Sequence, residues 1–383
     1  MTLISSAVTL IIQEPFPFTV LENINVVYYN KANIFLTIIS YYIRIIVKGS
    51  RKLGESLASN LNPDKPMIGF DLGGTKMLSL VLNNEYQILG RERKKTKDKD
   101  SGELNVNRII GAIKFSLESS NSAKIPGGIG IGVPGTLDLK NGVVLEAPNL
   151  GWKNLPIREL LEKEFSCPVV ISNDVDAGVY GEYCFGAGRN SQSVLGVFPG
   201  TGIGGGFVKN GDLFTSNHTS CMEIGHLPVV ADGLECGCGR SGCLETVASR
   251  LAISAAASMA IYRGEAPNLR KISGTDISLI RSGALASAIA AGDKKIEQIV
   301  RHAAMHLGRV LGGIINLLAP QTVVLGGGLV EAMPELYLEE VSKHSRNHVM
   351  PSFENTYKIA VAELGDDATA LGAAAWARKV IKT

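Results

Sequence analysis

The sequence predicts an α/β fold with two domains, and three observations support this. After Met67 the 383-residue chain alternates short apolar runs, typical of strands, with longer patterns typical of helices. Two of the apolar runs are interrupted by a glycine-rich turn, which indicates a strand, a tight turn and a strand. The length also exceeds what one hydrophobic core usually fills, and we expect a domain boundary in the Gly/Asn/Ser-rich stretch 186–193.

The first glycine turn lies in MIGFDLGGTKMLSLVLN, residues 67–83. Gly73 and Gly74 supply backbone freedom and bare amide groups that can approach a phosphate closely. Thr75 adds a hydroxyl, Lys76 follows the turn, and Asp71 can hold a metal-bound water. The turn is therefore a candidate phosphate loop, although a lone glycine hairpin usually does no more than reverse the chain.

The second glycine turn lies in FPGTGIGGGFVKNG, residues 198–211, and has the same strand, turn, strand pattern. Thr201 stands between Gly200 and Gly202. Neither turn clearly opens a helix, so neither is a Rossmann or Walker motif. Two such turns, each with a threonine beside glycines, favour a phosphate clamp with two sides.

Between the turns, PVVISNDVDAGVYGEY at 168–183 predicts a buried strand over 169–172 that leads into a helix. Asn173 and Asp174 stand where the strand ends, and either can cap the helix. The alternative to a pure cap is a general base. A carboxylate at the carboxyl end of a strand, in a cleft that faces phosphate loops, can accept a hydroxyl proton.

The segment EIGHLPVVADGLECGCGRSGCLE, residues 223–245, predicts a zinc site. His226, Cys236, Cys238 and Cys243 follow the spacing H-x9-C-x-C-x4-C and make a complete tetrahedral ligand set. A full set leaves no open position for a substrate, so the zinc is expected to be structural. The alternative is a disulfide or free thiols, although Cys236 and Cys238 are too close in sequence to pair easily with each other.

Further elements complete the α/β pattern. Apolar faces predict helices over 107–119, 244–261, 294–318 and 367–381, and strands over 322–325 and 357–364. The basic run 91–99 is interrupted by acidic residues and is interpreted as a solvated turn rather than a nucleic-acid patch.

These motifs, in this order, resemble the ROK family of sugar kinases and sugar-responsive repressors. The resemblance rests on DLGGTK, SND-x-x-A-x-x-x-GE, GTGIGGG and the EIGH to CLE segment, and it runs from Met67 to about Lys379. It implies the two-domain actin-like ATPase (ribonuclease H-like) fold with a structural zinc site. The first domain would comprise 67–188 with 366–383 and carry the first phosphate loop and the catalytic aspartate. The second, 189–365, would carry the other loop, the zinc segment and an adenosine loop.

The resemblance also implies roles for individual residues. Asp174 would take the proton from the sugar hydroxyl as it attacks ATP, which is bound with Mg²⁺. The implied sugar contacts are Asn149, Asn173, Glu223, His226 and Glu245, with His226 serving zinc through its other ring nitrogen. The implied ATP contacts are Asp71, Gly73, Gly74, Thr75, Lys76, Gly200, Thr201, Gly202, Gly326 and Gly327, the last two in the adenosine loop VVLGGG.

One departure from the family pattern concerns the sugar. Before Glu223 the family usually has small residues, often Ala-Gly, whereas this chain has Cys221 and Met222. A methionine narrows the loop that carries a sugar-binding glutamate. Substrate identity is therefore less certain than the reaction, and glucose and the N-acetylhexosamines both remain open.

Composition fits a cytoplasmic enzyme. The formal charge of +2 gives no reason to expect nucleic acid or an anionic membrane as a partner. The three cysteines outside the zinc set are scattered, which fits a reducing compartment. Residues 1–66 are predicted to be a poorly defined extension. The apolar stretch 34–47 is short for a membrane span, although a membrane anchor stays as a minor alternative.

Two functions remain open from sequence. The first is an ATP-dependent hexose kinase. The resemblance to the family also implies a homodimer. The second is a sugar-responsive repressor, for which the extension lacks a clear pair of capped helices and a basic footprint. Because both glycine turns and the Asn173-Asp174 pair are present, the kinase is preferred.

Overall fold

The computed structural model describes residues 65–96, 102–121, 125–216 and 219–382. The predicted extension lies outside them except for Lys65 and Pro66. The first strand starts at Met67, as predicted. Within the described residues no helix is long and apolar enough to cross a membrane.

The first sheet has five strands in the order β3-β2-β1-β4-β8. β1 pairs antiparallel with β2 and parallel with β4, and β4 pairs parallel with β8. The strands are β1 (Met67–Leu72), β2 (Lys76–Leu82), β3 (Ile88–Lys95), β4 (Gly128–Val133) and β8 (Val169–Asn173).

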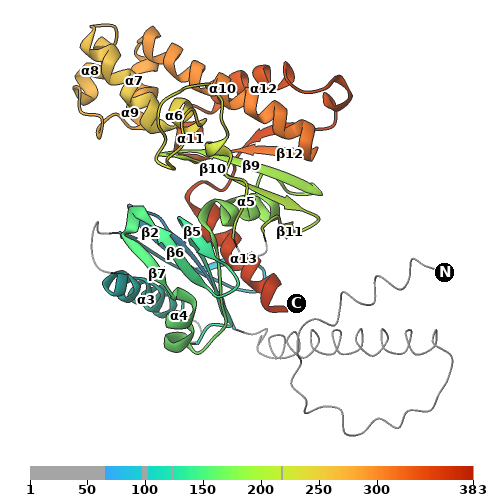
Figure 1. The fold of residues 1–383 in the computed structure, drawn as a ribbon. Helices are drawn as coiled ribbons and strands as arrows, with labels where there is room; N and C mark the ends of the chain where they lie inside the picture. Colours follow the sequence, from blue (N-terminus) through green and yellow to red (C-terminus); the bar gives the residue numbers. More distant parts are fainter. Residues whose placement is uncertain (1–64, 97–101, 122–124, 217–218, 383) are drawn as a thin grey trace, which may run out of the picture. The chain divides into compact units, whose positions relative to one another are not determined.

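Helices cover both faces of this sheet (Figure 1). One face packs on α3 (Gly102–Ser119) and α4 (Ile157–Phe165), and a small sheet joins the same core. The other face packs on α13 (Ala368–Lys382). The small sheet consists of β5 (Thr136–Asp138), β6 (Val143–Ala147) and β7 (Trp152–Leu155), and the 3-10 turn η1 (Pro148–Leu150) connects β6 to β7.

The second sheet repeats the strand order of the first, as β11-β10-β9-β12-β13. As in the first sheet, the central strand pairs antiparallel with the strand on one side, here β9 with β10. On its other side it pairs parallel with β12, which pairs parallel with β13. The strands are β9 (Ser193–Pro199), β10 (Ile203–Lys209), β11 (Asp212–Leu213), β12 (Thr322–Leu325) and β13 (Lys358–Val361). This repeat confirms the predicted fold class.

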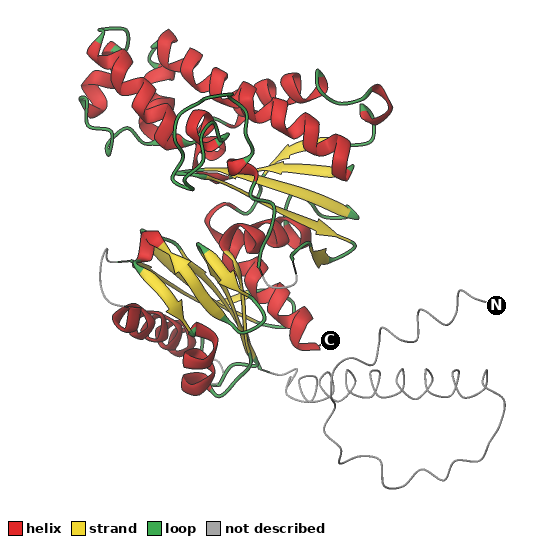
Figure 2. Ribbon diagram, viewed as in Figure 1, coloured by secondary structure: helices red, strands yellow, loops and turns green. Residues whose placement is uncertain are grey.

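The largest hydrophobic core lies between the second sheet and its helices. These helices cover the face that Leu195, Val197 and Phe207 present (Figure 2). They are α6 (Glu245–Ala248), α7 (Arg250–Tyr262), α8 (Pro267–Ser273), α9 (Ser282–Ala290), α10 (Lys294–Leu318), α11 (Gly327–Ala332) and α12 (Pro334–Arg346). The 3-10 turns of this part are η2 (Ile224–His226), η3 (Pro351–Phe353) and, before α13, η4 (Gly365–Asp367).

A tight pair of helices, α5 (Asp174–Phe185) and α13, lies between the two sheets. A Cβ at Gly181 would overlap the carbonyl oxygen of Ala368, and one at Gly372 would overlap that of Ala177. Because only glycine permits this approach, the two helices pack backbone to backbone. α5 also contacts β9 and β10, so one rigid pair connects both sheets.

Most predicted elements are confirmed, and two are corrected. The predicted helix over 244–261 is broken at Ser249, whose extended backbone ends α6 and whose hydroxyl caps α7 through the amide of Ala252. The basic run predicted as a turn is instead an edge strand up to Lys95. Its arginines pair with the acidic residues of η4, Arg93 with Asp366 and Arg91 with Asp367.

Candidate functional site

The first glycine turn joins β1 to β2 and is held by short-range bonds. Gly73 donates its amide to the Lys76 carbonyl at 2.9 Å, and the Thr96 hydroxyl donates to the Gly73 carbonyl at 2.8 Å. A Cβ built on Gly74 would lie 3.7 Å from Cβ of Asn149, so that exposed residue of η1 stands beside the turn. The turn predicted to bind ATP and the residue Asn149 predicted to bind the sugar are therefore neighbours.

Asp71 is the second-last residue of β1, next to this turn. The pKa of its carboxyl is raised to about 7, mainly by burial and also by the negative charges of Asp174 and Asp366, while Arg93 acts to lower it. The two aspartates of the predicted site therefore share one electrostatic environment. Lys76, the first residue of β2, keeps its side chain exposed.

Asp174 is the first residue of α5, and Asn173 is the N-cap. The Asn173 Oδ1 accepts from the amides of Val175 at 2.9 Å and Asp176 at 3.3 Å. Asp174 is therefore not needed as the cap, although its Oδ1 also accepts from the Val175 amide at 3.0 Å. The Thr369 hydroxyl of α13 donates to the Asp174 carbonyl at 3.2 Å and fixes this backbone from the other helix.

The electrostatic setting of Asp174 suits a proton acceptor. The pKa of its carboxyl is raised to about 6, mainly by burial, with the hydrogen bond from the Val175 amide acting to lower it and the charge of Glu223 to raise it. A base whose pKa lies just below neutrality is ionised at pH 7 yet still takes a proton readily. The position at the carboxyl end of β8 is the one predicted.

The second glycine turn joins β9 to β10 and is held by hydrogen bonds on two sides. The Glu245 Oε2 accepts from the Ile203 amide at 2.9 Å. On the other side Arg250 donates its amide to the Gly200 carbonyl at 2.8 Å and its Nη2 to the Thr201 hydroxyl at 2.9 Å. The turn is thereby tied to α6 and α7, the helices that follow the cysteine segment.

The predicted adenosine loop packs on this turn. Gly326 donates its amide to the Val197 carbonyl at 3.1 Å. Gly327 has a φ of 77°, and a Cβ there would lie 2.9 Å from the Pro199 carbonyl oxygen. Glycine is required both by the left-handed backbone and by the close approach.

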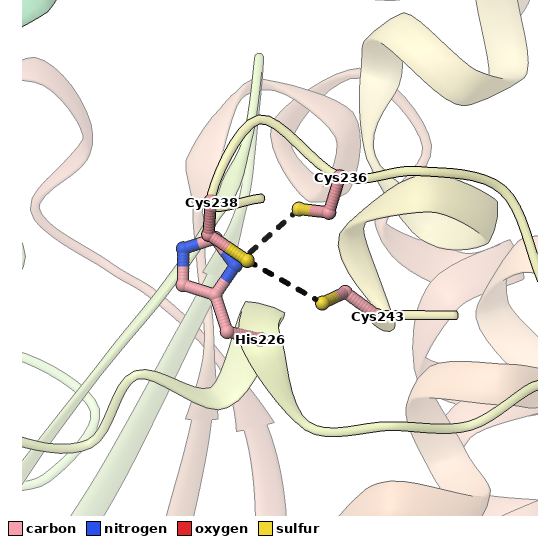
Figure 3. A group of neighbouring side chains, drawn as sticks. All are labelled: His226, Cys236, Cys238 and Cys243. Atoms are coloured by element: carbon pink, nitrogen blue, oxygen red, sulfur yellow. Dashed lines mark hydrogen bonds between the residues drawn. The ribbon is translucent and has the colours of Figure 1, made fainter. Parts of the chain in front are cut away.

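The predicted zinc ligands converge in one cluster (Figure 3). The donor atoms of His226, Cys236, Cys238 and Cys243 all lie within 4.8 Å of one another. The Cys238 and Cys243 sulfurs are 3.7 Å apart, and His226 Nδ1 is 3.5 Å from the Cys236 sulfur. Tetrahedral zinc with bonds of about 2.3 Å to sulfur separates two sulfurs by about 3.8 Å, so the donor set fits.

The disulfide alternative is not supported, because all six cysteines of the chain are free thiols in the structure. His226 turns Nδ1 toward the cluster, which leaves Nε2 as the nitrogen predicted to face the sugar. Its amide donates to the Glu223 carbonyl at 3.0 Å, so η2 links the predicted sugar-binding glutamate to the cluster.

Met222, the departure noted in the sequence, has a φ of 64°. This left-handed conformation favours glycine, so a methionine there is strained. Its side chain is partly buried against the large core, and its carbonyl accepts from the Ile224 amide at 2.7 Å. The backbone before Glu223 thus keeps a shape that suits the family's glycine.

Sequence reasoning missed Arg250 and Thr369. Arg250 was not recognised for two reasons. The helix break at Ser249 was not predicted, and the motif at 223–245 ends before Arg250. Thr369 reaches Asp174 from a helix almost two hundred residues further along, and no local pattern signals such a contact.

The paired sheets of equal strand order, with glycine turns at the first hairpin of each, are those of an actin-like ATPase fold. The chain belongs to the ROK family, whose profile matches residues 67–380.

Three similar proteins illustrate the range of this family. A glucokinase of Thermotoga maritima is 34% identical over 313 residues, which are 82% of this chain and 97% of that protein. A xylose repressor of Caldicellulosiruptor bescii is 29% identical over 308 residues, 80% of this chain and 76% of that one. The crystal structure of a ROK glucokinase from Streptomyces griseus with glucose and AMPPNP superposes with a TM-score of 0.72 at 32% identity, covering 82% and 99% of the two chains.

Proposed function

We propose that this chain is an ATP-dependent sugar kinase that phosphorylates a hexose at the 6-hydroxyl, with glucose preferred over an N-acetylhexosamine. The observation that carries this proposal is Asp174, whose carboxyl stands at the end of β8 with a pKa of about 6. Its charge acts on Asp71 beside the first glycine turn, and the charge of Glu223 acts on it. The likeness to glucokinases supports the same activity.

In the proposed reaction Asp174 is ionised and accepts the proton of the sugar hydroxyl. The hydroxyl oxygen forms a bond to the γ-phosphorus of ATP while the bond from that phosphorus to the bridging oxygen of ADP breaks. The Val175 amide, bonded to the Asp174 side chain, and the Thr369 hydroxyl, bonded to its carbonyl, hold the carboxylate in place.

The remaining roles concern binding. Glu223, Glu245, His226, Asn149 and Asn173 would bind the sugar. The two glycine turns would hold the phosphates of ATP. Mg²⁺ bound with ATP would neutralise charge on the phosphates, and Asp71 would hold a water of that ion. Zinc would be structural, held by His226 and the three cysteines, and would fix η2 and the start of α6.

A coupled assay of ADP release tests this proposal. Purified protein is given MgATP and a panel of hexoses that includes glucose, N-acetylglucosamine, N-acetylmannosamine and fructose. We expect sugar-dependent release of ADP, with the highest kcat/KM for glucose. The absence of stimulation by every hexose would contradict the kinase.

The alternative function is a sugar-responsive repressor, and the observation in its favour is the likeness to the xylose repressor. We prefer the kinase because a repressor needs no general base. The predictions of a homodimer, of a cytoplasmic location and of the domain boundaries remain predictions.

A further inference from the structure

Arg250 makes two hydrogen bonds to the second glycine turn, one from its backbone and one from its guanidinium. The amide bonds to Gly200, and Nη2 bonds to the hydroxyl of Thr201. An arginine side chain has five donors, and this contact uses only one hydroxyl as partner. The guanidinium is thus held at the turn, with most of its donors left for another group.

The charge of Arg250 has no carboxylate partner among the described residues. The same holds for Arg281, whose Nε donates to the Ser278 carbonyl at 3.3 Å. Burial lowers the pKa of Arg250, and the positive charge of Arg281 lowers it further, so the two guanidiniums repel each other. Two cations near each other without an acid between them are typical of a site that receives an anion.

Arg281 belongs to the same corner of the fold. It precedes Ser282, whose hydroxyl oxygen lies 3.7 Å from the Cβ position of Gly328 in the adenosine loop. That loop in turn packs on Pro199, next to the second glycine turn. The turn, the adenosine loop and the two arginines therefore meet at one place.

We propose that Arg250, assisted by Arg281, binds the phosphate chain of the nucleotide at the second glycine turn. This inference rests on the proposed kinase function and deepens it. The arginines, at the starts of α7 and α9, supply the positive charge that the turn itself lacks, and Thr201 orients the Arg250 guanidinium toward the phosphates.

The experiment measures the Kd of MgADP by calorimetry, the KM for ATP and the Kd of glucose. The variants are Arg250→Gln, Arg250→Lys and Arg281→Gln, compared with wild type. Arg270→Gln on α8 is the matched control, because this arginine is exposed like Arg281 and lies in the same part of the chain. Arg281→Gln removes a charge without touching the turn, so it separates charge from anchoring of Thr201.

We expect Arg250→Gln to weaken MgADP binding and raise the KM for ATP about tenfold or more, the scale of one charge-assisted hydrogen bond. Arg250→Lys should recover part of the loss. Arg281→Gln should weaken binding several-fold, and added salt should reduce that difference. The Kd of glucose should stay within about twofold, and Arg270→Gln should match wild type.

Two results would overturn the inference. In the first, wild type binds MgADP and is an active kinase, but Arg250→Gln and Arg281→Gln behave like it. In the second, Arg250→Gln loses affinity without recovery by Arg250→Lys while Arg281→Gln is unaffected, which assigns Arg250 only an anchoring role. If wild type neither binds MgADP nor uses ATP, the proposed function itself fails.

Discussion

The surroundings of Asp174 suit its side chain to the proposed role of general base. Asn173 caps α5, which releases the Asp174 side chain from that role. Burial then moves its pKa toward neutrality. Capping therefore falls to Asn173, and the Asp174 carboxyl remains for the proposed role of base.

The acid limb of the rate profile tests this assignment. Because the base must be ionised, kcat/KM for glucose should fall as the pH drops through about 6, whereas with an ordinary aspartate it would fall only near about 4. Asp174→Asn should lower kcat by about 100-fold or more and remove the limb. The measurement is kcat/KM for glucose from about pH 3.5 to 8, a range that includes both midpoints. A midpoint near 4, or an unchanged limb in the variant, would contradict the role of Asp174.

The strain at Met222 gives a second prediction. Met222→Ala and Met222→Gly both remove the side chain that packs on the core, so their difference reports the left-handed backbone. We expect the glycine variant to be more stable than the alanine variant by about 1 kcal/mol. Urea unfolding of the two variants measures this, and equal midpoints would show that the backbone carries no strain.

At the scale of elements, both chain crossings between the sheets are fastened to one buried carboxylate. Glu182 of α5 is fully buried. Its oxygens accept from the Ala187 amide at 2.9 Å on the first crossing, and from the Glu363 amide at 3.0 Å and the Leu364 amide at 2.8 Å on the second. A single side chain thus joins α5 to the segment before β9 and to the segment before α13.

Glu182→Gln should therefore be strongly destabilising. Glutamine offers one acceptor oxygen, and its amide group would face backbone donors, so buried amides lose their partners. We expect a loss of about 2–4 kcal/mol in the free energy of unfolding. Urea unfolding measures it, with Glu354→Gln, at an exposed position, as the control. A stability equal to wild type would show that the crossings do not depend on this carboxylate.

The cluster of His226 and three cysteines joins η2 to the start of α6. Glu223 is the N-cap of η2, and Glu245 is the first residue of α6. Metal analysis should give about one zinc per chain. Cys238→Ser should lose zinc and sugar affinity together, because the cluster holds both glutamates, whereas Cys184→Ser should keep both. Zinc-free protein with full sugar affinity would break this link.

Local patterns predicted much of the fold. The hairpins around Gly73 and Gly200 were predictable because two apolar runs border a glycine turn. The edge strand β3 was not, since its exposed residues are charged and lack apolar alternation. The break at Ser249 lies inside a continuous Ala-rich pattern, and only the hydroxyl cap reveals it.

The site was predictable where a motif brings its residues together, as in the cysteine cluster. Contacts between distant segments gave no signal. Thr369 to Asp174 and Glu182 to Leu364 join residues whose meeting depends on how α13 returns against α5. Such contacts follow from packing of glycine-lined helices, which no single segment encodes.

At the scale of the whole molecule, two sheets with the same strand order are joined through α5 and α13. The first residue of α5 is the proposed base, Asp174. The base, the two glycine turns and the cysteine cluster come from different parts of the chain. Their common purpose, in this account, is phosphoryl transfer from ATP to a sugar hydroxyl.

Formation of glucose 6-phosphate from glucose and MgATP tests this central claim most directly. The product is measured with glucose-6-phosphate dehydrogenase, for wild type and Asp174→Asn prepared side by side. The account predicts that wild type forms product only when both ATP and glucose are present. In the variant the rate should be reduced by about 100-fold or more. Absence of any phosphorylated hexose from wild type, or equal rates in the two proteins, would contradict it.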